Sequence, residues 1–318
     1  MLRYIQRRLL VSIPILFLVT VLMFALLQFT PGDPLDAYMS SDQPMPEAQQ
    51  EALRHRLGLD RPAPIRYLYW LKETAAGNLG YRAKTFEPVT DAIQRRIGPT
   101  LLLMGAAMLF GISLGIGLGV LSAVKQYSFL DTIMTIFAFL GISFPVYLAG
   151  LLALYVFSLR VGWFPAGGLS TAGQPFSLGD RIHHLILPAL IISVNYVAST
   201  MRYTRSAMLD VLGLDYVRTA RAKGLREQVI ILRHGLRNAL LPVITIIGAY
   251  IPNLLGGAVF IESIFSWPGL GRLYLEGIEA RDYPLIMGMT LVLAIVILLA
   301  NLLTDIAYGL VDPRIRYD

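Results

Sequence analysis

Six long stretches of this sequence contain no charged residue, and they constrain the fold more than any other feature. A helix needs about 20 largely apolar residues to cross a membrane, and the six stretches enclose 24, 28, 28, 20, 24 and 22 residues. The sequence therefore predicts an all-α membrane protein with six transmembrane helices. The stretches lie between Arg8 and Asp33, Arg96 and Lys125, Asp131 and Arg160, Arg181 and Arg202, Arg237 and Glu262, and Asp282 and Asp305.

A seventh uncharged stretch, residues 161–179, has a different character. It contains 19 residues, of which five are glycine and two are proline. Because Gly and Pro mark turns and loops, this stretch predicts a loop. Four prolines within the predicted spans are expected to kink their helices: Pro145, Pro188, Pro242 and Pro252.

The composition agrees with a membrane protein. Hydrophobic residues make up 55% of the chain and charged residues 15%, whereas soluble domains contain about 25% charged residues. The chain has no cysteine, which excludes disulfides, thiol nucleophiles and cysteine metal sites. The first apolar stretch is longer than the core of a cleavable signal peptide and has no A-x-A site after it, so we expect it to be retained.

The distribution of basic residues predicts which side of the membrane each loop faces. The net charge is +6; in a membrane protein this bears on topology, and we expect no nucleic-acid partner. With six spans, both termini share a side with Lys125 and with the loop from Arg202 to Arg237, which has eight basic residues. The two short loops on the other side hold four arginines. Because basic residues concentrate in cytoplasmic loops, we expect both termini to be cytoplasmic.

The polar segment after the first span predicts a small helical insert outside the cytoplasm. Two short helices are expected in it, ended by Gly58 and Gly77. The segment is too small for an independent core, so we expect a helical cap on the outer face of the bundle. The predicted parts are the N-terminal tip with the first helix (1–29), the extracytoplasmic insert (30–96), a five-helix core (97–308) with a cytoplasmic loop (202–241), and a cytoplasmic tail (309–318).

The cytoplasmic loop of residues 202–241 is the most informative segment. Asp215 suits a helix N-cap and Gly224 suits a C-terminal stop, which predicts a short helix between them. Alanines keep this helix slim, while Arg218, Arg221 and Lys223 make it basic. A helix this short is not stable alone. The residues leave two interpretations open: insertion into a groove of a partner protein, or a solvated basic loop that only sets topology.

At this loop the sequence resembles the permease subunits of ATP-binding cassette (ABC) importers. TARAKG at 219–224 followed by NALLP at 238–242 is similar to their cytoplasmic EAA loop. The 17 residues between Gly224 and Pro242 exceed the general spacing and match the longer form expected of the dipeptide, oligopeptide and nickel branch. Further similar motifs cover nearly the whole chain: PGDP (31–34), LGLDRP (57–62), GNLGY (77–81), GISFP (141–145), GWFPAGG (162–168), SWPGLGR (266–272), RDYP (281–284) and DPRIRYD (312–318).

The resemblance implies a type I importer permease of the B-type, in a bacterial or archaeal plasma membrane. Its implied partners are a second, C-type permease, two ABC ATPase subunits and an extracytoplasmic solute-binding protein, with di- or oligopeptides as the solute. The chain has no G-x-x-x-x-G-K-[ST] loop, so we expect no enzyme activity and no cofactor here, with ATP and Mg bound by the partners. The resemblance assigns ATPase coupling to Tyr216, Arg218, Thr219, Ala220, Arg221, Ala222, Lys223 and Gly224.

Polar residues within the predicted spans raise separate questions. Ser143, Asn195 and Asn253 are candidates for lining the translocation path or for packing between helices. Asp305 closes the sixth stretch, where we favour a structural role. Two alternative functions remain at this point: a secondary transporter that uses Asp305 as an ion site, and an assembly subunit without a pathway. An intramembrane enzyme fits least, because the sequence has neither an HExxH pair nor a Ser/His constellation.

Overall fold

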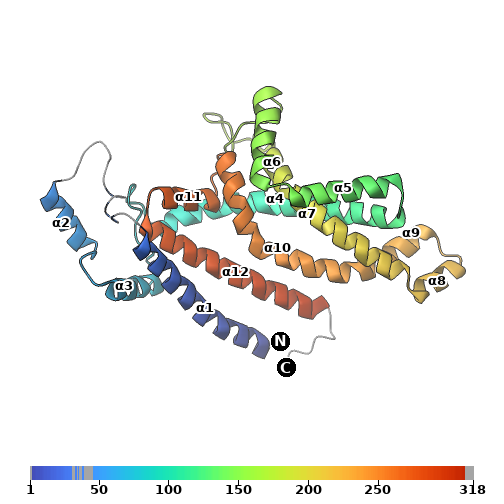
Figure 1. Ribbon diagram of the computed structural model, residues 1–318, viewed down its shortest axis with the longest axis horizontal. Coiled ribbons are helices and arrows are strands. Elements are labelled where there is room, and N and C mark those ends of the chain that lie inside the picture. The colour runs from blue at the N-terminus through green and yellow to red at the C-terminus, as the bar shows by residue number, and fades with distance from the viewer. Residues whose placement is uncertain (1, 31–32, 34, 36–37, 39–45, 312–318) are drawn as a thin grey trace. The chain divides into compact units, whose positions relative to one another are not determined.

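The computed structural model describes residues 2–30, 33, 35, 38 and 46–311. Its named elements are all helices (Figure 1), which confirms the all-α prediction. They are α1 (Leu2–Phe29), α2 (Glu47–Arg56), α3 (Ala63–Ala75), α4 (Val89–Val124), α5 (Phe129–Ser143), α6 (Val146–Ala153), the π-helix η2 (Leu154–Arg160), α7 (Leu178–Leu212), α8 (Asp215–Ala222), α9 (Glu227–Val229), the π-helix η3 (Ile230–Leu236), α10 (Arg237–Ile264), α11 (Leu270–Glu279) and α12 (Tyr283–Val311).

Four helices are long and apolar enough to cross a membrane, and two bent pairs raise the number to six if each pair is one span. The four are α1, α4, α7 and α12. The two bent pairs fall in the third and fifth predicted stretches. Residues 161–177 form the predicted loop. The prediction of six spans therefore holds if each bent pair is counted as one span. The third stretch, however, is not one straight helix.

The break in the third stretch lies at Phe144–Pro145. Here α5 and the α6–η2 helix meet at 102°. Proline disfavours the helical conformation in the residue before it, and Phe144 is extended (φ −83°, ψ 125°), while Pro145 precedes the first turn of α6. A milder bend of 44° separates Leu240 from Pro242. Pro188, in contrast, lies within the continuous α7.

The chain forms two compact units that gather segments far apart in sequence. Among the described residues, unit 1 contains residues 99–268 and 300–311. Within it α7 packs against α5, α6 and α10. The largest core cluster of this unit combines residues from α4, α6, α7, α10 and the loop after α10: Leu103, Met104, Ala107, Ala153, Leu187, Ala189, Ile192, Tyr196, Tyr250, Ile261, Phe265 and Trp267.

A row of glycines on α4 lets that helix approach α7 closely. Gly111, Gly115 and Gly119 are spaced four residues apart, so they share one helix face. A Cβ atom at each of them would lie 2.6–2.7 Å from a side-chain carbon of α7. Small residues at this spacing permit close helix contact in membranes. The two helices are therefore in close contact over about two turns of α4.

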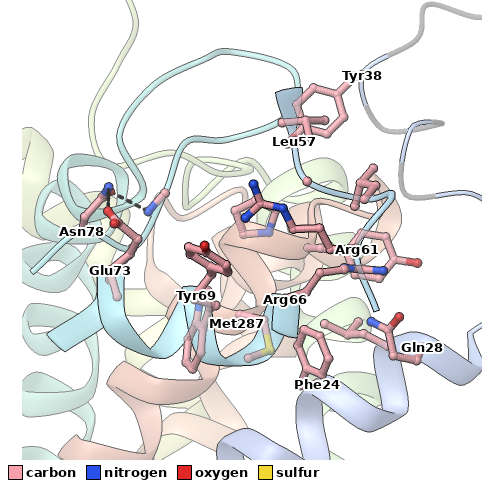
Figure 2. A pocket seen from close by; sticks show the side chains of 18 of the residues that line it. Phe24, Gln28, Tyr38, Leu57, Arg61, Arg66, Tyr69, Glu73, Asn78 and Met287 are labelled. Atoms are coloured by element: carbon pink, nitrogen blue, oxygen red, sulfur yellow. Dashed lines mark hydrogen bonds between the residues drawn. The ribbon is translucent and has the colours of Figure 1, made fainter. Parts of the chain in front are cut away.

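Unit 2 contains residues 2–98 and 269–299. Both helices predicted in the insert are present as α2 and α3, and Gly58 (φ 67°) and Gly77 (φ 88°) follow them in the left-handed conformation that glycine tolerates best. The buried Tyr67 of α3 contacts α1, because its hydroxyl lies 2.9 Å from the Thr20 hydroxyl. Unit 2 also contains an open cavity of about 400 Å³ (Figure 2).

Candidate functional site: the α8 segment

The predicted short helix after α7 is present as α8, and it begins one residue earlier than expected, because its cap is Leu214 and not Asp215. Asp215 is the first helical residue, and Leu214 occupies the cap position without a side-chain hydrogen bond. The Asp215 side chain is 97% exposed and lies 3.5 Å from Arg218. A carboxylate in the first turn is favoured by the helix dipole. Asp215 therefore acts through charge in the first turn and not as the N-cap.

Gly224 ends α8 in the way that the sequence predicts. Its φ is 75°, and its amide donates to the carbonyl of Arg221 at 2.9 Å. The amide of Leu225 donates to the carbonyl of Ala220 at 3.3 Å. Together these bonds form a Schellman motif, which satisfies carbonyls at the end of the helix. A Cβ at Gly224 would meet nothing within 4 Å, so the backbone conformation alone favours glycine.

One face of α8 is docked and the other is free. Val217 and Ala220 are buried in a cluster with Ile230, and Leu212 packs against it. This cluster attaches the helix to the end of α7 and to η3. The remaining predicted coupling residues on the helix and just after it are exposed: Tyr216, Arg218, Thr219, Arg221, Ala222, Lys223 and Gly224.

Polar contacts tie α8 to the segment that follows it. Asn238 of the NALLP motif donates through Nδ2 to the Tyr216 hydroxyl at 2.9 Å. Arg221 pairs with Glu227 at 2.8 Å, and this pair raises the pKa of Arg221 and lowers the pKa of Glu227. Both side chains are exposed, so the pair orients the loop more than it stabilises it. The sequence shows the TARAKG and NALLP motifs, but nothing in it indicates that the side chains of Tyr216 and Asn238 form a hydrogen bond.

The residues proposed to line a path are distributed over three helices of unit 1. Ser143 is the last residue of α5, and Asn195 lies on α7; both are exposed in this single chain. Asn253 belongs to α10, and its side chain lies outside the described residues. Asp305 is half-buried near the end of α12, beside Thr304, whose hydroxyl donates to the Gly248 carbonyl of α10 at 3.1 Å.

Sequence reasoning missed the role of Asp131, which it used only to mark the end of a span. Asp131 is buried, and Arg205 of α7 donates to both of its carboxylate oxygens, each at 2.8 Å. The Ser122 hydroxyl and the Tyr127 amide also donate to it. This bidentate pair joins the first turn of α5 to α7, about two turns before the end of α7. Its only sequence signal is a charged residue at the edge of an apolar stretch.

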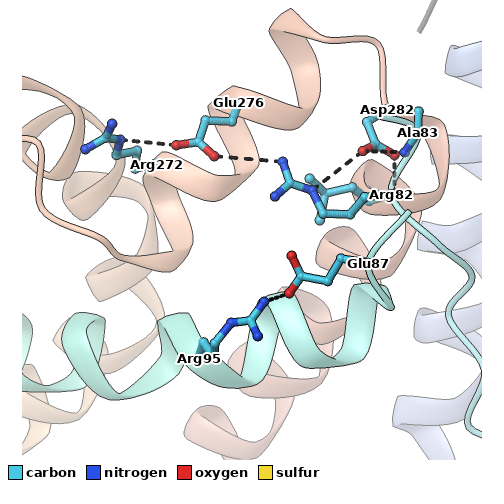
Figure 3. A network of polar contacts seen from close by, with 8 residues as sticks. Arg82, Ala83, Glu87, Arg95, Arg272, Glu276 and Asp282 are labelled. Carbon is cyan, nitrogen blue, oxygen red and sulfur yellow. Dashed lines mark hydrogen bonds and ion pairs between the residues drawn. The ribbon is translucent and has the colours of Figure 1, made fainter. Parts of the chain in front are cut away.

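A second buried carboxylate, Asp282, organises the RDYP motif in unit 2 (Figure 3). Its oxygens accept from the amides of Ala83 at 3.0 Å and Leu285 at 3.2 Å. Arg82 lies 3.8 Å from Asp282 and 3.9 Å from Glu276. Burial raises the pKa of Asp282, against the lowering effect of the two amides and of Arg82. Asp282 therefore holds the insert to the start of α12.

Comparisons with known proteins cover nearly the whole sequence. Residues 115–317 match the family model of the binding-protein-dependent transport system inner membrane component, and residues 1–104 match the N-terminal model of such membrane components. A putative peptide permease protein of Brucella suis biovar 1 is 51% identical over 99% of both chains. The oligopeptide transport system permease protein AppB of Bacillus subtilis is 45% identical over 99% of both chains.

A solved structure shares the fold at low identity. An inward-facing conformation of the MetNI methionine ABC transporter aligns with a TM-score of 0.56 and 19% identity, over 70% of this chain and 97% of that chain. This likeness supports the helical arrangement alone.

Proposed function

The chain belongs to the family of binding-protein-dependent transport system inner membrane components, and from this premise we propose that it carries peptides across the membrane and couples to ATPase subunits through α8. It is a multi-pass permease subunit of an ABC importer, a system in which the ATPase is a separate subunit and a binding protein delivers the solute. No observation favours the two alternative functions, which are a secondary transporter and an assembly subunit without a pathway.

The docked but exposed α8 carries the coupling proposal. Eight residues are too few for an independently stable helix, yet this helix is held on one side by Val217 and Ala220. Its free side presents Arg218, Thr219 and Ala222. A preorganised helix loses little conformational freedom when a partner binds it. We infer that this exposed face enters a groove of the ATPase subunit.

The solute, the path and the remaining partners complete the proposal. The names of the relatives in Brucella suis and Bacillus subtilis favour di- or oligopeptides. We propose a second, C-type permease that shares the path with Ser143, Asn195 and Asn253, and two ATPase subunits that bind ATP and Mg. The basic residues of the α8 loop favour a cytoplasmic side for both termini by the positive-inside rule. In this scheme the chain is not itself an enzyme, and Asp305 is structural.

Co-purification tests the assembly. The tagged full-length chain is isolated in mild detergent, and the proteins that accompany it are identified. We expect a second multi-span permease and P-loop ATPases, and we expect peptide uptake in liposomes to require ATP and a binding protein. A chain that purifies alone and moves solute without ATP would contradict the proposal. It would favour a secondary transporter that uses Asp305 as an ion site.

A pair of glycine variants tests the role of α8. Gly224→Ala forces a side chain into the left-handed conformation, at a cost of about 1 kcal/mol, without any steric contact. Gly213→Ala is the matched control, because Gly213 precedes α8 at an ordinary φ of −79°. We expect Gly224→Ala, and more strongly Gly224→Asp, to lower peptide transport per ATP hydrolysed. Equal transport by assembled Gly224→Asp and wild-type complexes would overturn the coupling role.

A further inference from the structure

The cavity in unit 2 is lined by apolar side chains on one side and by charged and polar side chains elsewhere. Its apolar side is formed by Phe24 and Leu27 of α1, Trp70 of α3 and Met287 of α12, and its volume is about 400 Å³. Figure 2 shows arginine side chains in the cavity, whereas Glu73 and Asn78 lie toward the other end, where the Asn78 amide donates to Glu73 at 2.9 Å. Such a combination suits a ligand that is partly apolar and partly charged.

Arg61 and Arg66 bring two positive charges to this cavity without a carboxylate partner in the described part of the chain. The guanidinium of Arg61 lies 4.6 Å from the centre of the Tyr69 ring, and that of Arg66 lies 5.9 Å from the centre of the Phe24 ring. Burial lowers the pKa of Arg66, as expected for a cation that is only partly hydrated. Arg66 is half-buried and Arg61 is exposed, so both guanidinium groups can accept an anionic ligand at the cavity.

Tyr38 adds a hydrogen-bond donor to the same cavity. Burial, with a smaller contribution from the negative charge of Asp282, raises the pKa of Tyr38 to about 12. The phenol therefore stays protonated at neutral pH. Two guanidinium groups and a phenol match the acceptor oxygens of a phosphate.

The surroundings of the cavity are those of a membrane surface. Two of its walls are the ends of helices that qualify as membrane spans, α1 over Ile5–Phe29 and α12 over Tyr283–Ile306. On α1, Leu22, Leu26 and Phe29 are exposed beside the wall residues Phe24 and Leu27. On α3, Ile65 and Leu68 are exposed on a helix that also carries Tyr69 and Trp70, a composition typical of the interface between lipid and water.

We propose that this cavity binds a membrane phospholipid, with its phosphate at Arg61 and Arg66 and its acyl chains along the exposed side of α1. The lipid phosphate supplies a negative charge to two guanidinium groups that have no carboxylate partner among the described residues. It also covers apolar surface at the junction of the insert with the membrane. The lipid is thus a structural ligand of the insert, distinct from the transported solute.

Lipid binding to the assembled complex tests the proposal. The complex containing the full chain is stripped of lipid in detergent, and phosphatidylglycerol binding is measured by native mass spectrometry and by thermal unfolding. The variants Arg66→Gln and Arg61→Gln/Arg66→Gln are compared with Lys72→Gln, which removes one positive charge from α3, as Arg66→Gln does, but at an exposed position outside the cavity. We expect at least tenfold weaker binding in the double variant and unchanged binding in Lys72→Gln.

A single variant controls for misfolding of the double variant, and competition by soluble compounds identifies the source of the phosphate. Arg66→Gln alone, which keeps the stacking of Arg61 on Tyr69, should bind at least threefold more weakly. Equal lipid binding by the wild type and the assembled Arg66→Gln or double variant would overturn the proposal. Glycerophosphoglycerol, inorganic phosphate and a dipeptide should not displace the lipid at equal concentration. Displacement by the first two would mark a soluble-anion site, and displacement by the dipeptide a solute site; either result would overturn the lipid assignment.

Discussion

The α4–α7 contact of unit 1 and the cavity of unit 2 use small and charged residues in different ways. In unit 1 three glycines bring α4 against α7, and the buried Asp131 is matched by Arg205 on both oxygens. In unit 2 a cavity of about 400 Å³ remains, and Arg61 and Arg66 have no carboxylate partner among the described residues. Close packing and a bidentate ion pair resist deformation, whereas cations beside a cavity that have no carboxylate partner in the described part of the chain favour a ligand.

This difference has a functional consequence for unit 1. The α8 helix is attached to the end of α7 through Leu212 and Val217, and α7 is fixed earlier by Arg205. If α8 docks in an ATPase groove as proposed, a movement of α8 reaches a helix that is held by packing and by an ion pair. Four changes test whether the two units differ in this way.

Removal of the Asp131 carboxylate should have the largest effect. Asp131→Ala leaves Arg205 without its partner, which costs about 3 kcal/mol; the 27% exposure of the Arg205 side chain keeps the cost at the lower end of the range. We expect a clear fall in the unfolding temperature of the purified protein in detergent. The double variant Asp131→Leu/Arg205→Met should recover much of the loss, because it leaves no uncompensated charge. Equal losses in the single and double variants would contradict the importance of the pair.

Enlarging a glycine of α4 should have the next largest effect. A Cβ at Gly115 would lie 2.7 Å from the Thr200 Cβ and 3.0 Å from the Val197 carbonyl oxygen, whereas a Cβ at Gly117 meets nothing within 4 Å. Gly115→Leu should therefore destabilise the protein by about 2 kcal/mol, and Gly117→Leu should not. Thermal unfolding of the two variants side by side measures the difference, and similar behaviour would show that α4 and α7 are not closely packed.

Neutralising Asp282 should have a smaller effect, because backbone amides and not a bidentate arginine hold it. Asp282→Asn replaces one acceptor oxygen by an amide nitrogen, so one of the amides of Ala83 and Leu285 loses its acceptor. The expected cost is about 1 kcal/mol, measured by thermal unfolding. Glu276→Gln is the control, since its side chain is 34% exposed and its ion pairs contribute little. A loss as large as that of Asp131→Ala would remove the contrast between the units.

The pH dependence of the Asp282 contribution should be the smallest effect. Burial raises the pKa of Asp282 in the folded protein above the value of about 3.9 expected when unfolded. Its contribution is therefore fully present below about pH 4 and is lost as the pH rises through the folded-state pKa. The unfolding temperature of the wild type minus that of Asp282→Asn should be greater at pH 4 than at pH 7. A constant difference would indicate an unshifted carboxyl.

The sequence by itself determined the features that depend on a few neighbouring residues. The six apolar stretches indicated the spans, because hydrophobic length alone decides whether a segment can cross a membrane. Gly58, Gly77 and Gly224 marked helix ends, since a left-handed conformation is a local property of the backbone. The α8 helix was predicted for the same reason, although its cap was assigned to Asp215 and lies at Leu214.

Only the tertiary structure decided which distant residues meet. Pro145 was expected to kink its span, but the 102° angle follows from how α5 and α6 pack against α7 and α10. Asp131 and Arg205 are 74 residues apart, and Ala83 and Asp282 are 199 apart. Hydropathy and turn preferences act within one or two helical turns, whereas these pairings depend on the packing of whole helices. The cavity around Arg61 and Arg66 belongs to this second class, because a space is defined by all of its walls together.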